Sequence, residues 1–252
     1  MIGIEIGLGI AIGLALGLLG GGGSILTVPI LVYIVGQDAS AAVASSLAIV
    51  GANALFGVSM HWKAGHVRLQ QALLFGLAGM AGAYVAAGFT QYVSDQLLMT
   101  IFALLMLVVA VLMLRPLKVN EATDTPPRSH LWKLLLTGGG VGLVTGFLGV
   151  GGGFLIVPAL VLVMGMSMVD AVGSSLLIIV MNAIAGLFGH LQHGALDWAV
   201  VAIFTVSGLV GVALGTYLSQ RWSAQRLRTI FAVMVLMLAV TLLAVNVPQL
   251  IG

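Results

Sequence analysis

The chain has 252 residues, of which 61% are hydrophobic and only 6% are charged, whereas an ordinary soluble domain carries about 25% charged residues. This composition indicates an integral membrane protein. The nine Lys and Arg residues cluster between apolar runs, as orientation signals of membrane proteins do, so we expect no nucleic-acid partner. The sequence contains no Cys, which excludes disulfides, thiol chemistry and Cys-ligated metal sites.

Five apolar segments precede the middle of the chain. A spanning helix needs roughly 20 residues, so the third, fourth and fifth segments are long enough, the first is marginal, and the second is too short to cross perpendicularly without help. The segments are Ile2–Leu19, Gly22–Val35, Ala39–Met60, Leu69–Val93 and Gln96–Leu114.

A polar stretch from Arg115 to His130 follows, with charges and a Pro pair that a bilayer interior does not accept. After it the apolar pattern restarts. We expect an all-α polytopic membrane protein with a first transmembrane repeat over residues 1–115, a cytoplasmic linker over 116–130 and a second repeat over 131–252. The later segments are Leu131–Leu148, Gly151–Met164, Met168–Gly189, Leu196–Ser219 and Ala224–Val245.

The two halves are copies of one another at a constant offset of 129 residues, which carries Pro29 to Pro158 without gaps. Repeats of this size build many secondary transporters. The same offset relates Gly17 to Gly146, Gly20 to Gly149, Ser45 and Ser46 to Ser174 and Ser175, Asn53 to Asn182, Gly57 to Gly186, His61 to His190 and Gly65 to Gly194.

Basic residues gather in three regions, which the positive-inside rule assigns to the cytoplasm. Only an odd number of crossings per half puts all three on one side, with the loops around Asp38, Asp95, Ser167 and Asp197 outside. We therefore expect two inverted repeats with both termini outside. Parity does not separate five crossings per half from three plus a re-entrant hairpin of the first two segments; we favour five. The basic regions are His61, Lys63, His66 and Arg68; Arg115, Lys118, Arg128 and Lys133; and Arg221, Arg226 and Arg228.

Most carboxylates have a local explanation. Asp38, Asp197 and Ser167 stand before apolar segments, as Ser94 and Ser223 do, and are expected to be helix N-caps. Asp170 completes a capping-box-like pair with Ser167. No carboxylate is then left for the membrane interior, which argues against a carboxylate proton relay and against an intramembrane hydrolase.

Two Gly-rich stretches interrupt the apolar runs, "GLLGGGGSILTVP" from Gly17 to Pro29 and "GFLGVGGGFLIVP" from Gly146 to Pro158. Close helix packing needs Gly at every fourth position, whereas consecutive Gly residues break a helix. A break exposes backbone N–H groups at a positive helix end, which is an anion site. We expect two tips that meet near the midplane and bind an anion, with the two Pro residues as kinks. The tip residues are Gly20, Gly21, Gly22, Gly23 and Ser24, and Gly149, Gly151, Gly152 and Gly153.

The third and eighth segments present matching polar faces. Gly57 and Gly186 are interpreted as packing residues, whereas an Asn amide at this depth pairs either with a helix neighbour or with a substrate oxygen. His61 and His190 lie near segment ends and are expected to be interfacial, yet they are the best candidates for proton-linked titration. The candidate substrate contacts on these faces are Ser45, Ser46, Asn53, Ser174, Ser175 and Asn182.

The doubled Gly-rich motif, followed by "AVASS" or "AVGSS" and then by Asn, resembles the sulfite exporter TauE/SafE family of bacterial membrane proteins. The resemblance covers the whole chain except the linker. It implies a transporter of small sulfur-containing anions such as sulfite, sulfoacetate or related organosulfonates in the bacterial inner membrane. Val150 replaces the Gly that its position has in the first copy, so the two tips are unequal.

The leading hypothesis is thus a secondary transporter, a probable exporter, that works by alternating access, uses no cofactor and is not an enzyme. A passive anion channel would use the same anion site, and a membrane-embedded enzyme is disfavoured because no buried nucleophile, carboxylate pair or metal set is visible. The expected partners are a small anionic substrate and the lipid bilayer. The sequence leaves the oligomeric state open, a homo-oligomer included.

Overall fold

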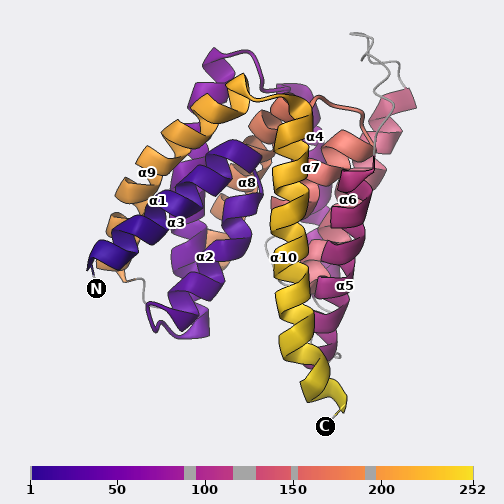
Figure 1. The fold of residues 1–252 in the computed structure, drawn as a ribbon. Helices are drawn as coiled ribbons and strands as arrows, with labels where there is room; N and C mark the ends of the chain where they lie inside the picture. Colours follow the sequence, from indigo (N-terminus) through magenta and orange to yellow (C-terminus); the bar gives the residue numbers. More distant parts are fainter. Residues whose placement is uncertain (1, 88–94, 116–128, 149–152, 191–196, 252) are drawn as a thin grey trace.

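The computed structural model describes residues 2–87, 95–115, 129–148, 153–190 and 197–251. All regular structure in these ranges is helical (Figure 1). The helices of the first half are α1 (Ile2–Leu19), α2 (Gly22–Tyr33), α3 (Ala39–Lys63), α4 (Leu69–Ala87) and α5 (Asp95–Leu114). Those of the second half are α6 (Ser129–Leu148), α7 (Gly153–Leu162), α8 (Met168–His190), α9 (Trp198–Arg221) and α10 (Ala224–Ile251).

The helix lengths separate spanning helices from short ones. Five helices, α3, α4, α8, α9 and α10, are long and apolar enough to cross a membrane. By contrast, α2 has 12 residues and α7 has 10, which at 1.5 Å per residue gives about 18 and about 15 Å, well short of a hydrocarbon core of about 30 Å. The chain is therefore a multi-pass membrane protein in which the second helix of each half is too short to span.

The predicted helix break in the first Gly cluster is confirmed. α1 ends at Leu19 and α2 begins at Gly22, and between them Gly20 has a φ of +71°. This left-handed conformation is one that side chains with a Cβ rarely adopt, so Gly is needed there. Pro29 lies inside α2, and Pro158 inside α7. In the second cluster, Gly149, Gly151 and Gly152 lie outside the described residues.

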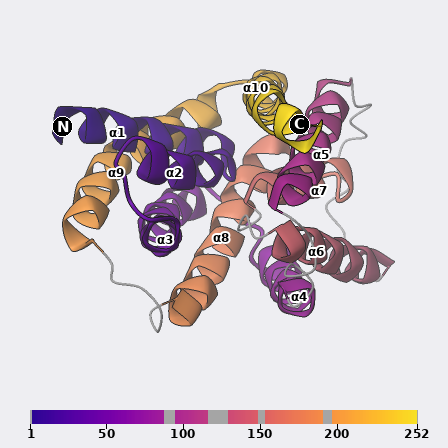
Figure 2. The same cartoon turned by 90° about the horizontal axis from the view of Figure 1, so that it is seen from below.

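The first helix of each half packs against the fourth helix of the other half. α1 packs along α9, and α6, its counterpart in the second half, packs along α4. Seen from below, α1, α2, α3 and α9 form one group, α4, α6 and α7 lie in another, and α8 stands between them (Figure 2). α3 contacts α8, and α5 contacts α10. Each group therefore combines the first helices of one half with the fourth helix of the other.

Close contacts at glycine residues occur in both of these helix pairs. A Cβ on Gly13 of α1 would overlap the carbonyl of Gly208 on α9, and a Cβ on Gly142 of α6 would overlap the carbonyl of Gly79 on α4. These two contacts are related by the 129-residue offset. Small residues allow such close approach of membrane helices. The α1–α9 pair and the α4–α6 pair therefore pack through equivalent glycine contacts.

The packing interpretation of Gly57 and Gly186 agrees with their surroundings. A Cβ on Gly57 would lie 2.9 Å from a methyl of Leu176, and a Cβ on Gly186 would lie 3.0 Å from a methyl of Leu47. Leu176 and Leu47 are again related by the 129-residue offset. α3 and α8 therefore pack through a repeated Gly–Leu contact.

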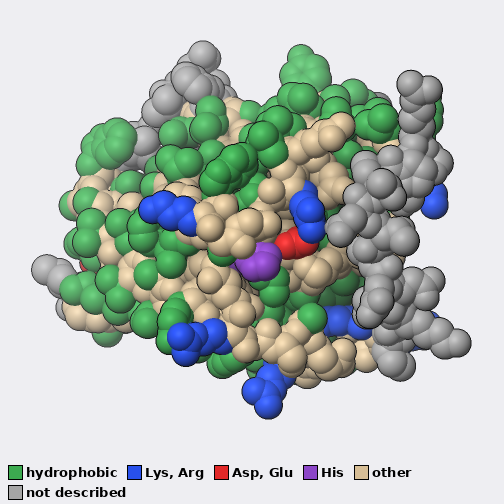
Figure 3. Space-filling view, turned by 90° about the horizontal axis from the view of Figure 1, so that it is seen from above, with side chains coloured by type: hydrophobic (Ala, Val, Ile, Leu, Met, Phe, Trp, Pro, Cys, Tyr) green, Lys and Arg blue, Asp and Glu red, His purple; other side chains and the backbone are tan. Residues whose placement is uncertain are grey.

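The described residues of the three basic regions share one end of the molecule. α3 and α9 run side by side in the same direction, because Asn53 contacts Gly208 and Gly57 lies near Val212, so both helices end together. Arg228, at the start of α10, donates to the carbonyls of Leu112 and Arg115 at the end of α5. Figure 3 looks onto the end where α9 turns into α10, and Lys and Arg side chains spread over it.

The expectation that Ser167 lies outside together with Asp38 is wrong. Asp38 precedes α3, whereas Ser167 caps the start of α8, where Asp170 pairs with Arg68 just after α3. α3 has 25 residues, about 37 Å in length, and it separates the two positions. Asp38 and Ser167, which the 129-residue offset relates, therefore lie at opposite ends of α3.

Candidate functional site

The two Gly-rich tips touch each other. Gly21, the N-cap of α2, packs directly on the backbone of Gly153, the first residue of α7, and a Cβ on Gly21 would overlap the Gly153 carbonyl. Gly20 lies against the Ser175 hydroxyl of α8 and against Val157 of α7. The described parts of the tips therefore meet as the sequence predicts, at the starts of two short helices.

The described part of the contact between the tips is closely packed. Ser24 donates its hydroxyl to the Gly21 carbonyl at 2.7 Å and also lies against Gly153. Gly22 is covered by the end of the Met234 side chain, and Gly23 lies against the backbone of α1. Gly20, Gly21, Gly22 and Gly23 are all buried. Backbone atoms of opposite halves are therefore in direct contact in the described part of the tips.

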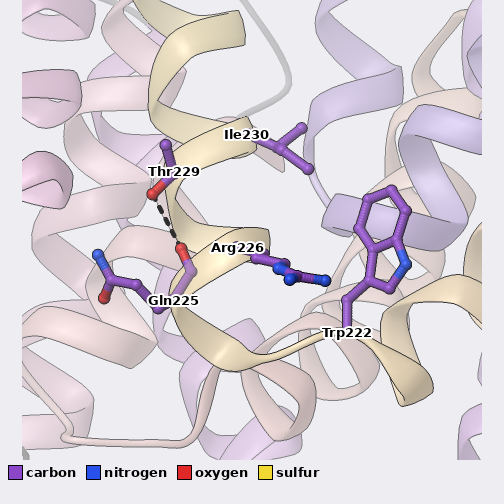
Figure 4. A pocket seen from close by; sticks show the side chains of 5 residues that line it. All are labelled: Trp222, Gln225, Arg226, Thr229 and Ile230. Atoms are coloured by element: carbon purple, nitrogen blue, oxygen red, sulfur yellow. Dashed lines mark hydrogen bonds between the residues drawn. The ribbon is translucent and has the colours of Figure 1, made fainter.

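Two hollows among the described residues lie away from the tips. One is bounded by Trp222, Gln225, Arg226, Thr229 and Ile230 around the start of α10, with the Arg226 guanidinium pointing toward Trp222 (Figure 4). In it, Thr229 donates its hydroxyl to the Gln225 carbonyl at 2.9 Å. The other is an apolar groove between α1 and α10. Both are open to the outside of the molecule, and neither is lined by the Gly tips.

Two of the candidate serines bond to their own helices. Ser46 donates to the Val43 carbonyl, and Ser175 donates to the Val172 carbonyl, each at 2.8 Å. Their protons are therefore engaged, and only their lone pairs remain for other partners. These two hydroxyls therefore bond within their own helices.

The neighbouring serines differ between the halves. Ser174 accepts a hydrogen bond from the Arg68 backbone N–H at 3.0 Å. Ser45, its counterpart on α3, is fully buried, and its hydroxyl has no partner among the described residues. The first half therefore has an unpaired hydroxyl where the second half has one held by a loop.

The two Asn residues also differ. Asn53 is fully buried against Gly208 of α9, and neither its amide nitrogen nor its amide oxygen has a hydrogen-bond partner within the described ranges. Asn182 is only half-buried. Since a buried amide without partners costs free energy, Asn53 is the more unusual of the pair.

His61 lies in the last turn of α3, near the helix end as the sequence predicts, but its side chain is enclosed by the protein. It is fully buried, and neither ring nitrogen has a hydrogen-bond partner among the residues described. It lies between α1 and α8, close to the backbone of Gly17 and with its Cβ beside Gly173. His61 is buried because the α3–α4 loop and α8 cover the end of α3. His190 ends α8, and its side chain lies outside the described set.

Asp170 is a functional candidate that the sequence pattern did not single out. Its backbone N–H bonds to the Ser167 hydroxyl at 3.1 Å, which confirms Ser167 as an N-cap. Its carboxylate, however, accepts from Arg68 and lies 2.9 Å from Nδ1 of His66. Position 41, its counterpart in the first half, is Ala. This break in the duplication was the available signal that Asp170 does more than cap.

The other expected N-caps differ in whether their side chains bond to the helix that follows. Asp197 accepts from the N–H groups of Ala199 and Val200, and Ser223 accepts from that of Arg226. Asp38 occupies the N-cap position of α3 without a side-chain cap bond. Ser94 lies outside the described residues.

Comparison with known proteins places the chain in a family. The family model described as "Sulfite exporter TauE/SafE" matches residues 5–242. No solved structure matches the chain.

Curated relatives match over most of their length. A "Probable membrane transporter protein" of Xylella fastidiosa strain 9a5c is 36% identical over 94% of this chain and 93% of its own. A probable membrane transporter protein of Bacillus subtilis is 25% identical over 81% and 83%, and one of Methanocaldococcus jannaschii is 24% identical over 84% of each chain. These names indicate a transporter and not an enzyme. The chain belongs to the sulfite exporter TauE/SafE family of membrane proteins.

Proposed function

We propose that the protein is a secondary transporter of small sulfur-containing anions, such as sulfite or short organosulfonates, in the bacterial inner membrane. The observation that carries the proposal is the contact of Gly21 with Gly153, where two short helices begin. The first N–H groups of each helix have no partner within that helix, and both helices begin where the tips meet. Helix N-termini of this kind bind anions in broken-helix transporters.

The charge distribution supports a compact oxyanion. The sequence has no Lys or Arg between Arg68 and Arg115, nor between Lys133 and Arg221. The negative charge of a substrate at the tips would then be balanced by backbone N–H groups and helix dipoles. Such a site favours sulfonate or sulfite oxygens, which accept several N–H bonds, over bulky apolar acids.

Alternating access would move the closed tips apart. The repeated contacts α1–α9 and α4–α6 support two inverted halves related by a pseudo-twofold axis. Rocking one group of helices against the other would separate Gly21 from Gly153 and admit an anion from one side at a time. With the basic end in the cytoplasm, both termini lie outside.

Flux measurements in proteoliposomes test the proposal. Uptake of labelled sulfite or methanesulfonate should saturate, and it should be accelerated by unlabelled anion on the opposite side. Acetate and chloride should compete poorly. Large unitary currents without saturation would instead identify a channel, and the absence of any sulfur-anion flux would remove the proposed substrate class.

A further inference from the structure

We propose that His61, reached through His66 and Asp170, is a proton-binding site that couples proton uptake to anion binding. This inference rests on the proposed function, because it assigns the coupling ion of the same transporter. Three observations carry it: a buried imidazole without partners, a chain of titratable groups leading to it from the surface, and its position beside the Gly tips.

The first observation is the environment of His61. The side chain has no exposed surface, and both ring nitrogens lack partners among the described residues. Ionisable side chains inside the membrane region are costly and mark proton or ion pathways. An imidazole with two unpaired nitrogens can take up a proton without first losing a hydrogen bond.

The second observation is the route to the surface. His66 is 36% exposed, and its Nδ1 lies 2.9 Å from Oδ1 of Asp170. Arg68 donates to Oδ2 of the same carboxylate through Nε and Nη2, so Asp170 is held in place. A carboxylate on Nδ1 fixes the tautomer of His66 and leaves Nε2 for proton transfer. The ring centroids of His66 and His61 are 6.5 Å apart, so proton transfer between the two rings would need an intervening water molecule.

The third observation is the distance to the anion site. His61 lies beside Gly17 and Gly173. Gly17 precedes Gly20 by three residues, and Gly173 precedes Ser175 by two, so each is within one helical turn of a residue at the tips. A proton on His61 would therefore supply the positive charge that no Lys or Arg provides there.

The groups that face His61 define its electrostatics. His66 and Asp170 act on it from the α3–α4 loop and from α8. From α1 the backbone of Gly17 faces the imidazole, and at the end of α9 Arg221 lies over the Tyr217 ring. Protonated His61 attracts an anion at the tips, and by reciprocity a bound anion favours protonation of His61. Proton and anion thus bind together.

Calorimetry tests the coupling with methanesulfonate, whose charge is constant between about pH 5.5 and about pH 8. For the wild type, Kd should rise by up to about tenfold per pH unit toward the alkaline end, and titrations in buffers of different ionisation enthalpy should show about one proton taken up per anion. His61→Gln should bind with the weak alkaline affinity at every pH and take up no proton. Lys63→Gln is the matched control, since it removes an exposed cation from the same helix end and should behave as wild type.

His66→Gln tests whether His66 passes protons to His61 without itself being the proton-binding site. It should keep the proton uptake per anion but slow pH-gradient-driven uptake in proteoliposomes. A pH-independent wild-type affinity, or a His61→Gln variant that keeps the pH dependence, overturns the coupling and leaves the proposed function intact. If His61→Gln does not fold, wild-type proton uptake and His61→Asn decide the question. If neither methanesulfonate nor sulfite binds at any pH, the proposed function fails, and the coupling fails with it.

Discussion

Arg68 donates two hydrogen bonds to the Asp170 carboxylate, from Nε at 3.2 Å and from Nη2 at 3.0 Å. The pair joins the loop after α3 in the first half to the first turn of α8 in the second half. The backbone N–H of Arg68 also donates to Ser174, one turn along α8. The loop is therefore fastened to the helix that carries Ser175, which touches the first Gly tip.

Asp170→Asn should weaken this link with a modest loss of stability. The Arg68 side chain is 51% exposed, so we expect the free energy of unfolding to fall by only about 0.5–1 kcal/mol. The effect on transport should be larger, because the pair joins the loop after α3 to α8, which stands between the two groups of helices that are proposed to rock. Thermal melts in detergent and proteoliposome flux measure the two effects.

Asp38→Asn is the matched control for Asp170→Asn. It makes the same carboxylate-to-amide change at the start of a long helix, at an exposed residue without a side-chain cap bond. Neither melting temperature nor flux should change. Equal effects of the two substitutions would show that general charge, and not the link to Arg68, is responsible.

Single cysteines should report which residues share a side of the membrane. The native chain has no Cys, and Asp38, Ala64 and Ser167 are exposed. In intact cells, an impermeant maleimide should label Asp38→Cys but not Ala64→Cys or Ser167→Cys, because the latter two lie at the basic end. Labelling of Ser167→Cys together with Asp38→Cys would contradict the arrangement of α8 beside the α3–α4 loop.

Substitutions at the first Gly tip should separate folding from binding. A Cβ on Gly21 would overlap the Gly153 backbone, so Gly21→Ala should strongly reduce the yield of folded protein. A Cβ on Gly22 would lie 2.6 Å from the terminal methyl of Met234, a flexible side chain that can move. Gly22→Ala should therefore fold and bind methanesulfonate more weakly, as calorimetry can measure.

Gly79→Ala is the control for the tip variants. Its Cβ would lie 3.4 Å from the Gly138 carbonyl in a helix contact remote from the tips in sequence. Folding and affinity should both remain close to wild type. Should Gly22→Ala bind the anion normally while folding well, the N-terminus of α2 would lose its assigned role.

The sequence predicted the elements of this fold better than their partners. Uninterrupted apolar runs bounded by Gly, Pro and charged residues define helix limits locally, so α1 coincides with its predicted range and the break at Gly20 was foreseen. The pairing of α1 with α9 was not, because it depends on which Gly-lined face of one half meets which face of the other. Helix periodicity in a single chain does not contain that information.

The candidate site was predictable from the sequence only in part, because several of its contacts also depend on tertiary packing. The duplicated Gly clusters pointed to tips that meet, and Gly21 does contact Gly153. The pairing of Asp170 with Arg68 escaped, because the local capping pattern already explained Asp170. Burial of His61 escaped because it results from α8 and the α3–α4 loop covering the end of α3, which is a tertiary effect.

Asn53→Leu should reveal whether the unpaired amide serves structure or transport. Leu places two methyl groups where Asn53 has its amide atoms, and those atoms have no partner among the described residues. Replacing an unsatisfied buried amide by an apolar group of the same shape removes its desolvation cost. The melting temperature should therefore stay the same or rise, by an amount worth up to about 1 kcal/mol.

The same variant should nevertheless lose transport if the amide binds substrate once the tips have parted. Asn182→Leu is the comparison, since Asn182 occupies the equivalent position but is only half-buried and has less desolvation cost to recover. A lower melting temperature for Asn53→Leu would mean that the amide finds a structural partner. Unchanged flux with a raised melting temperature would leave the amide without a role in transport. Stability gained together with flux lost is the combination that a substrate-binding amide predicts, because a site tuned for a ligand costs free energy when the ligand is absent.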